Sequence, residues 1–246
     1  AMNIVNRVTL EHMKQNRRRT LVTIVGVIIA VAMITAVTTI TGSFMDLFRR
    51  NTIRETGLWH VLFEQVPANR LDALLSDGNV DQISLYQDGL FAQIPNIATE
   101  QRPYLYVQRY TAQGLVQLPV TLVEGRLPQK EGEIVVSDKL ALIGKVRYEL
   151  GDTLKLNLGK RIGQAEDQSE FELPWQAGYE EDERFVPLRE ETYTVVGVVD
   201  PGGMERNWYG GYQALALLDP AALEGETVNA KVALKQVDNG LYAWAE

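Results

Sequence analysis

The sequence contains no cysteine and only two histidines, and both features exclude classes of site. Without cysteine the chain cannot form a disulfide, an iron–sulfur cluster or a cysteine-liganded zinc site. His12 and His60 lie on either side of a long uncharged segment, so the two imidazoles cannot share one site if that segment crosses a membrane. A catalytic triad would have to use His60 alone, and no other residue supports one.

Familiar catalytic and nucleotide-binding motifs are also missing. Gly144-Lys145 and Gly159-Lys160 lack both the first glycine and the Ser or Thr of a P-loop. The sequence has no G-x-S-x-G and no H-E-x-x-H. The acidic run 180–183 lacks the spaced Asp or Asn residues and the glycine of a calcium loop. We therefore expect no enzyme activity and no metal or cofactor bound by this chain.

Charge is absent from one long stretch, because no Asp, Glu, Lys, Arg or His occurs between Thr20 and Met45. At ~1.5 Å per residue, a helix of this stretch measures roughly 39 Å and exceeds the ~30 Å hydrocarbon core of a bilayer. A backbone in lipid must satisfy its own hydrogen bonds, so we predict one transmembrane helix over residues 20–45. A cleaved signal peptide is the alternative, but its apolar region spans only about 7–15 residues.

The charges around this stretch predict its orientation. Arg17 to Arg19 directly precede it and form a denser cluster than Arg49 and Arg50 beyond it, so the positive-inside rule places the N-terminus in the cytoplasm. The chain up to Arg50 has seven basic and two acidic residues and therefore a net charge of +5. Because the whole chain has a net charge of −8, the residues after Arg50 carry a net charge of −13. We expect a bacterial cell membrane protein whose acidic main domain is extracytoplasmic and repels nucleic acid.

Two short segments flank the predicted span. Residues 1–19 are predicted to form a cytoplasmic amphipathic helix, with its helical pattern in residues 3–15, that either rests on the membrane surface or contacts a cytoplasmic partner. Residues 46–57 continue the helical spacing, and Gly57 is a candidate C-cap. We expect this second segment to be a stalk, which is either a passive spacer or a carrier of motion. Ala1 is expected to be a cloning remnant.

The residues from 58 to 246 change to a mixed pattern and predict a strand-rich extracytoplasmic domain, formed as one body or as two subdomains. Helices are predicted over 67–75 and over 137–143, with Ser137 as N-cap, and a helical turn is predicted over 220–223. Runs of strands with a few helices indicate an α+β fold. The predicted strands cover 58–63, 82–94, 104–110, 120–123, 133–136, 153–158, 192–199, 212–218 and 228–234.

Two long connections, 159–191 and 201–211, carry aromatic residues that are candidate ligand contacts. Packing of these rings over the sheet is the other interpretation, and the residue types favour it. The acidic run in the first connection, within an acidic domain, makes a cationic peptide a candidate ligand. The candidate contact residues are Phe171, Trp175, Tyr179, Trp208 and Tyr209.

Four short motifs, spread over residues 125–199, place glycine and proline at turns beside apolar strands. In their order and spacing they resemble the MacB-like periplasmic core domain of FtsX-like permease subunits of ABC transporters. The motifs are Gly125-Arg126-Leu127-Pro128, Gly132-Glu133-Ile134-Val135-Val136-Ser137, Leu150-Gly151-Asp152-Thr153-Leu154 and Tyr193-Thr194-Val195-Val196-Gly197-Val198-Val199.

The resemblance implies a permease that pairs with a second copy in the lipid bilayer and with a separate cytoplasmic ABC ATPase subunit, which binds the ATP. ATP hydrolysis there would move the outer domain to export or expel a peptide, antibiotic or lipoprotein, or to control cell-wall hydrolases. Such permeases have three or more further membrane helices after the outer domain, so we expect this chain to be an N-terminal part. The alternatives are a membrane-anchored binding or sensor domain without transport activity and an anchored enzyme of unknown type.

Overall fold

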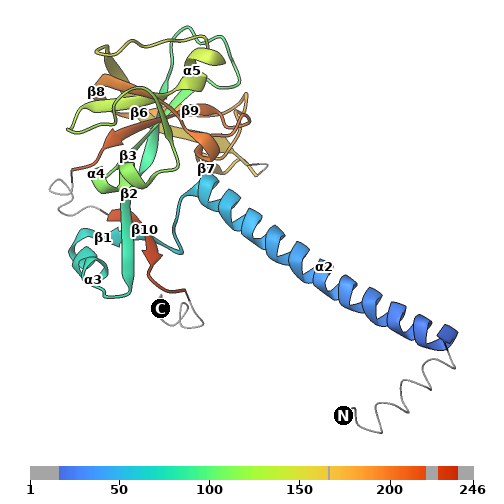
Figure 1. Cartoon of the computed structure of the whole chain (residues 1–246). Coiled ribbons are helices and arrows are strands. Elements are labelled where there is room, and N and C mark those ends of the chain that lie inside the picture. The colour runs from blue at the N-terminus through green and yellow to red at the C-terminus, as the bar shows by residue number, and fades with distance from the viewer. Residues whose placement is uncertain (1–16, 166, 220–226, 238–246) are drawn as a thin grey trace. The chain divides into compact units, whose positions relative to one another are not determined.

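The computed structural model describes residues 17–165, 167–219 and 227–237 (Figure 1). The chain divides into two compact units, residues 1–51 and 52–246, and each is described by itself. The predicted amphipathic helix over 3–15 and the predicted turn over 220–223 lie outside the described residues.

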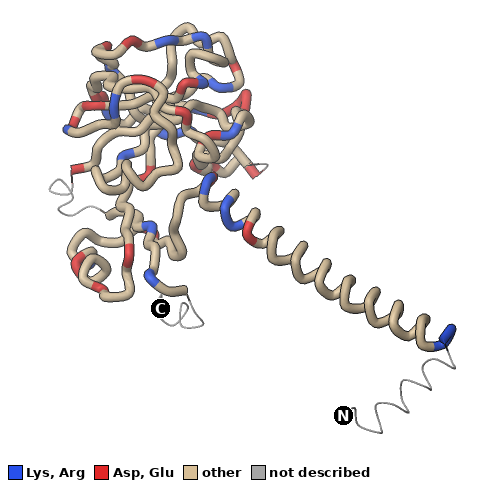
Figure 2. The backbone as a smooth tube through the Cα atoms, in the orientation of Figure 1, with Lys and Arg blue, Asp and Glu red and all other residues tan. Residues whose placement is uncertain are grey.

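Helix α2 (Arg17–Thr56) forms the described part of the first unit, and its last turn belongs to the second. Among the described residues it is the one helix long and apolar enough to cross a membrane, with a mean hydropathy of 2.6 over its most apolar window. Its threonines do not interrupt it: the Thr35 and Thr38 hydroxyls donate to the carbonyls of Val31 and Ile34 at 2.9 and 3.0 Å. The helix therefore satisfies its own polar groups, as lipid requires, and Figure 2 shows its central part without charge.

The end of α2 agrees with the predicted cap. Gly57 follows the last helical residue with a φ of +85°, and its N–H donates to the Ile53 carbonyl at 2.9 Å. A glycine adopts this left-handed conformation without steric cost, which is why it ends many helices.

The second unit is built on one ten-stranded sheet with the strand order β1-β10-β2-β3-β9-β5-β8-β6-β7, in which β4 pairs with β8. The pairs β3–β9 and β5–β8 are parallel and the others are antiparallel. The described elements of this unit, after α2, are β1 (Val61–Pro67), η1 (Ala68–Arg70), α3 (Leu71–Leu75), β2 (Val80–Gln93), β3 (Tyr104–Tyr110), α4 (Ala112–Gln117), β4 (Thr121–Gly125), β5 (Glu133–Ser137), α5 (Asp138–Leu142), β6 (Thr153–Gln164), β7 (Glu170–Glu172), β8 (Arg184–Asp200), η2 (Gly202–Met204), β9 (Gly211–Leu217) and β10 (Thr227–Leu234). This mixed architecture confirms the α+β prediction.

Two large apolar cores lie within this unit, and β2 contributes to both. One core packs α3 against β1, β2 and β10, and it includes Ile83 and Leu85. The other lies between β3, β5, β6, β8, β9 and α5, and it includes Ala92 from the far end of β2. In Figure 1, β2 accordingly runs from the strands beside α3 toward the strands beside β6.

The predicted long connection over residues 159–191 is wrong, because most of it is sheet. β6 continues to Gln164, β7 adds a short strand, and β8 begins at Arg184, so that Ile162 pairs with Arg184. The added part of β8 is largely exposed and charged, so it shows no apolar alternation by which a strand could be recognised. Helix α4, which is capped by the Thr111 side chain, was not predicted either, because it is too short to show a helical period.

An ion pair closes the turn between β4 and β5. Arg126 Nη1 and Nη2 each donate to one Glu133 carboxylate oxygen at 2.6 Å, and the Gln129 N–H donates to the same carboxylate at 2.9 Å. These bonds, with those from Arg126 foremost, lower the pKa of Glu133 from 4.5 to about 2. A depressed pKa in the folded state stabilises the fold above pH 4.5, and this contribution is lost as the pH falls toward 2.

Replacing Arg126 with glutamine is expected to raise the Glu133 pKa toward its ordinary value. The acid-induced loss of stability between pH 4.5 and 2 should become correspondingly shallower. Carbon-detected NMR titration of the glutamate carboxyl groups measures the pKa directly. Arg184→Gln is the matched control, because it breaks the exposed pair with Glu170 and should leave Glu133 unchanged. An unaltered Glu133 pKa in Arg126→Gln would contradict the assignment.

Candidate functional site

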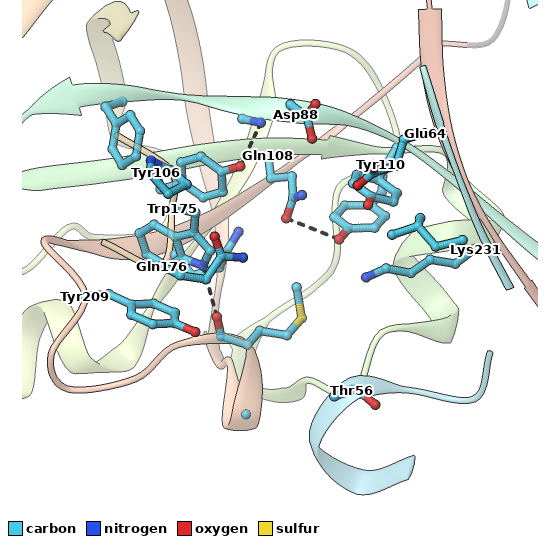
Figure 3. A pocket seen from close by; sticks show the side chains of 18 of the residues that line it. Thr56, Glu64, Asp88, Tyr106, Gln108, Tyr110, Trp175, Gln176, Tyr209 and Lys231 are labelled. Carbon is cyan, nitrogen blue, oxygen red and sulfur yellow. Dashed lines mark hydrogen bonds between the residues drawn. The ribbon is translucent and has the colours of Figure 1, made fainter. Parts of the chain in front are cut away.

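A cavity of about 610 Å³ opens in the second unit (Figure 3). It is lined by the last turn of α2, by the strands β1, β2, β3, β9 and β10, and by the segments that precede β8 and β9. Ligand pockets commonly measure ~300–1,000 Å³ and combine apolar walls with a few polar groups. The cavity is therefore the candidate site.

Strand β3 supplies the first wall through its two-residue period. Its alternate residues Tyr106, Gln108 and Tyr110 line the cavity, while Leu105 and Val107 face the apolar core behind it. From the segment between β7 and β8, Trp175 stacks on Tyr106 with ring centroids 4.4 Å apart and planes 9° from parallel.

Two further contacts hold this indole in place. Its Nε1–H donates to the Met204 carbonyl at 3.1 Å, and Tyr209 meets the ring edge-on at 5.0 Å. Trp175 therefore links the segment before β8, the segment before β9 and strand β3 in one aromatic wall.

The end of the lining away from Trp175 combines aromatic rings with one cation. Tyr86 stacks on Tyr110 at 5.2 Å. The Lys231 ammonium from β10 lies 5.0 Å from the Tyr86 ring centre and 6.0 Å from that of Trp59. In Figure 3 the Lys231 nitrogen points into the open space, toward the side that holds Trp175.

Burial changes the acidity of the tyrosines in these walls. It raises the pKa of Tyr86 to about 12, with Asp88 and Glu64 adding to the effect. It also raises the pKa of Tyr106 and Tyr110 well above their ordinary value. All three phenols therefore remain neutral at physiological pH, and the wall offers hydroxyl groups rather than phenolate charge.

The last turn of α2 forms part of the cavity rim and is joined closely to η2. The Glu55 carboxylate accepts a charged hydrogen bond from Arg206 at 2.7 Å. A Cβ placed on Gly203 would lie 2.6 Å from the Glu55 carbonyl oxygen, so only glycine allows this approach. We call the contact of Glu55 with Gly203 and Arg206 the helix joint.

The structure separates the five residues that the sequence singled out. Trp175 and Tyr209 line the cavity. Tyr179 and Trp208 line a different hollow of about 1,110 Å³, where Trp208 is 66% exposed. Phe171 lies on β7 and is 44% exposed. Whether any of them contacts a ligand stays a prediction, although the packing of Trp175 and Tyr209 agrees with the interpretation that some rings cover the sheet.

Sequence reasoning missed the strand residues of the cavity, Tyr106, Tyr110, Gln213 and Lys231. Tyr104, Tyr106 and Tyr110 share one face of β3 and carried a signal, because polar aromatics on one face of a strand indicate a wall that is not purely core. Lys231 and Gln213 carried no comparable local signal. Within the residues that the structure describes, no group of three or more His, Asp or Glu is placed to hold a metal ion.

The family profile of the MacB-like periplasmic core domain matches residues 20–236. The chain belongs to this family. The match confirms the resemblance of the sequence to the core domain of ABC transporter permeases, and the MacB-like domain here carries an apolar N-terminal helix, as that resemblance implies.

Two solved structures are similar to the MacB-like chain. One is the extracellular domain of the noncanonic ABC-type transporter YknZ from Gram-positive bacteria, with 14% identity and a TM-score of 0.40 over 74% of this chain and 86% of that one. The other is the periplasmic region of MacB from Actinobacillus actinomycetemcomitans, with 10% identity and a TM-score of 0.40 over 74% and 72%. No curated protein matches the chain significantly.

Proposed function

We propose that this chain is the N-terminal part of an ABC transporter permease that converts ATP hydrolysis by a separate cytoplasmic ATPase into movement of its extracytoplasmic domain. Family membership supports the permease assignment. The basic cluster at Arg17 to Arg19 supports a cytoplasmic N-terminus. The chain itself carries no catalytic site in this proposal, and it binds ATP only through the partner.

The helix joint is the observation that carries the proposal. Helix α2 is unbroken from its apolar part to Thr56. Its last turn contacts Gly203 of η2 and Arg206 in the segment before β9, beside Met204 and Tyr209 of the cavity. A displacement of the helix end therefore acts directly on the segment before β9 and on the cavity wall.

The absence of cysteine makes this movement measurable with introduced labels. Lys155→Cys offers a site whose side chain is 73% exposed. With the permease and its ATPase in nanodiscs, we expect the distance between spin labels on the two copies to shift when nucleotide is trapped. ATP hydrolysis without any shift would contradict force transfer and would favour an anchored binding or sensor domain.

Gly203→Val is expected to uncouple movement from hydrolysis. Its side chain would overlap the Glu55 backbone, and overpacking of this kind costs about 1–3 kcal/mol, which weakens the joint on the order of 10-fold. The nucleotide-dependent distance shift should shrink while ATP hydrolysis continues. Gly78→Val is the matched control, because a Cβ there meets no atom within 4 Å. An unchanged shift in Gly203→Val would contradict the role of the joint.

The proposed cargo is a peptide, antibiotic or lipoprotein, with a cationic peptide favoured by the acidic character of the chain. Figure 2 shows acidic residues distributed along the backbone of the second unit. Titration of the full chain in nanodiscs with cationic peptides should show binding at low salt that weakens at high salt. Absence of binding at low salt would remove this preference and leave the permease assignment in place.

A further inference from the structure

The charges that line the cavity are unevenly paired. Glu55 pairs with Arg206 at 2.7 Å, and Glu172 pairs with Lys160 at 2.5 Å. Asp88 accepts a hydrogen bond from the Asn229 amide at 2.8 Å. The Lys231 ammonium, by contrast, lies only against ring faces and makes no hydrogen bond or ion pair with any described residue.

Lys231 is also largely withdrawn from water. Burial lowers its pKa, and no neighbouring carboxylate offsets this effect. The Glu64 carboxylate makes no hydrogen bond or ion pair with a described residue either, but it lies exposed on β1, where water solvates it. An incoming anion stabilises a half-buried ammonium without an acceptor more than it stabilises an exposed one. The folded protein has already removed part of the water from the buried group, so that part of the desolvation cost does not fall on binding.

A second unpartnered group lies in the same lining. Gln213 is fully buried beside Tyr106 on β9, and its Oε1 has no hydrogen-bond partner. The backbone N–H of Gln213 donates to Glu205 at 2.8 Å, and its Nε2 donates to the Ala214 carbonyl at 3.3 Å. A buried acceptor without a donor costs about 1–3 kcal/mol, so a ligand N–H or O–H is favoured there.

We propose that this cavity binds the carboxylate-bearing end of a peptide-like ligand, with the carboxylate at Lys231, an amide N–H at Gln213 and an apolar or aromatic side chain between Lys231 and Trp175. The inference deepens the proposed function by naming the chemistry of its ligand. A cationic peptide also carries a C-terminal carboxylate, so the two proposals agree.

The cation itself argues for a carboxylate rather than a phosphate. Lys231 is the sole basic residue among the described residues that line the cavity, and it is a point charge without the fork of an arginine. Asp88, Glu64 and Glu172 in the same lining would repel a doubly charged phosphate more strongly than a singly charged carboxylate.

The test compares N-acetyl-phenylalanine with its neutral primary amide, using the full chain in nanodiscs of zwitterionic lipid. The indole N–H resonances of Trp59 and Trp175 report binding, because both rings line the cavity. We expect the acid to bind at least about 10-fold more tightly than the amide, as one charge-assisted hydrogen bond of about 1.5–3 kcal/mol allows.

Three substitutions and one control assign this preference. Lys231→Met keeps the apolar stem and should abolish the preference for the acid, whereas Lys231→Arg should retain most of it. Gln213→Leu should weaken the acid and the amide equally, because both carry the N–H. Lys155→Met removes an exposed ammonium outside the cavity and should change nothing. Circular dichroism confirms that each variant is folded.

The outcomes separate this inference from the proposed function. Equal affinities for acid and amide, or a preference that survives in Lys231→Met, would overturn the carboxylate site. Tighter binding of phenylalanine amide, which carries a cationic amine, would show that the acidic residues dominate and would overturn it as well. These measurements need no ATPase, so their failure leaves nucleotide-driven movement intact, and absence of that movement leaves the binding result intact.

Discussion

Replacing Arg161 with alanine is expected to lower the free energy of unfolding of the second unit by about 3–5 kcal/mol. Arg161 is fully buried, and its guanidinium donates to Glu183 at 2.9 and 2.5 Å and to the Gly178 carbonyl at 2.5 Å. Its removal leaves the Glu183 carboxylate, only 1% exposed, as an uncompensated buried charge. Urea denaturation of the whole chain in detergent micelles, followed by near-ultraviolet circular dichroism, measures the loss.

The same guanidinium also organises aromatic residues around it. It lies 5.2 Å from the centre of the Phe91 ring and 5.1 Å from that of Tyr104. Burial, followed by a hydrogen bond to Glu183, raises the pKa of the Tyr104 hydroxyl. Because Arg161 holds the segment that follows Trp175, its loss should also disturb the aromatic wall and broaden the indole resonance of Trp175.

The matched control is Arg184→Ala on the neighbouring strand. Arg184 pairs with Glu170, but the two side chains are 60% and 61% exposed. Pairs of this kind contribute about 0–1 kcal/mol, because water and salt screen them. The double variant Arg161→Met with Glu183→Gln should recover part of the loss, since it removes both charges. Equal losses in Arg161→Ala and Arg184→Ala would contradict the importance of burial.

The second large effect is expected at Gly125, where alanine should cost about 2–5 kcal/mol. Gly125 has a φ of +76°, a conformation that costs an L-residue about 1–2 kcal/mol. In addition, a Cβ there would lie 2.3 Å from the Val196 carbonyl oxygen and 2.8 Å from the Gly197 Cα. These are backbone atoms of β8 that cannot turn aside, so overpacking adds about 1–3 kcal/mol.

Gly132→Ala separates the two causes. Gly132 has nearly the same φ, +74°, but the nearest atom to its Cβ is 3.8 Å away. It should therefore lose only the conformational part, about 1–2 kcal/mol. The same urea denaturation compares both variants. Similar losses in the two would show that the backbone conformation, and not the close approach of β4 to β8, explains the glycine.

Local signals predicted much of the fold. The charge-free run of α2, the glycine that ends it, the alternating strand β3 and the Ser137 cap of α5 each depend on neighbours in the sequence. The strands over 159–164 and 184–191 escaped prediction because cross-strand pairing holds them. The first contains two glycines and the buried, charged Arg161, and the second is mostly exposed, so neither shows an apolar alternation.

The site was predictable only in part. Trp175 and Tyr209 stood out as aromatics outside the predicted strands, and both line the cavity. Lys231 and Gln213 looked like ordinary strand residues. Their importance rests on what they lack, and a missing partner becomes visible only when every neighbour in space is known.

The sequence by itself therefore determined the apolar helix, the α+β class and the family, because charge, hydropathy and turn residues act locally. The orientation of the helix stays a prediction from the charges that flank it. Only the tertiary structure decided which charges are neutralised. It brings Glu55, Tyr106 and Lys231 to one cavity although they lie far apart along the chain. The physical reason is that electrostatic and hydrogen-bond energies depend on distances of a few ångströms, and the fold alone sets those distances.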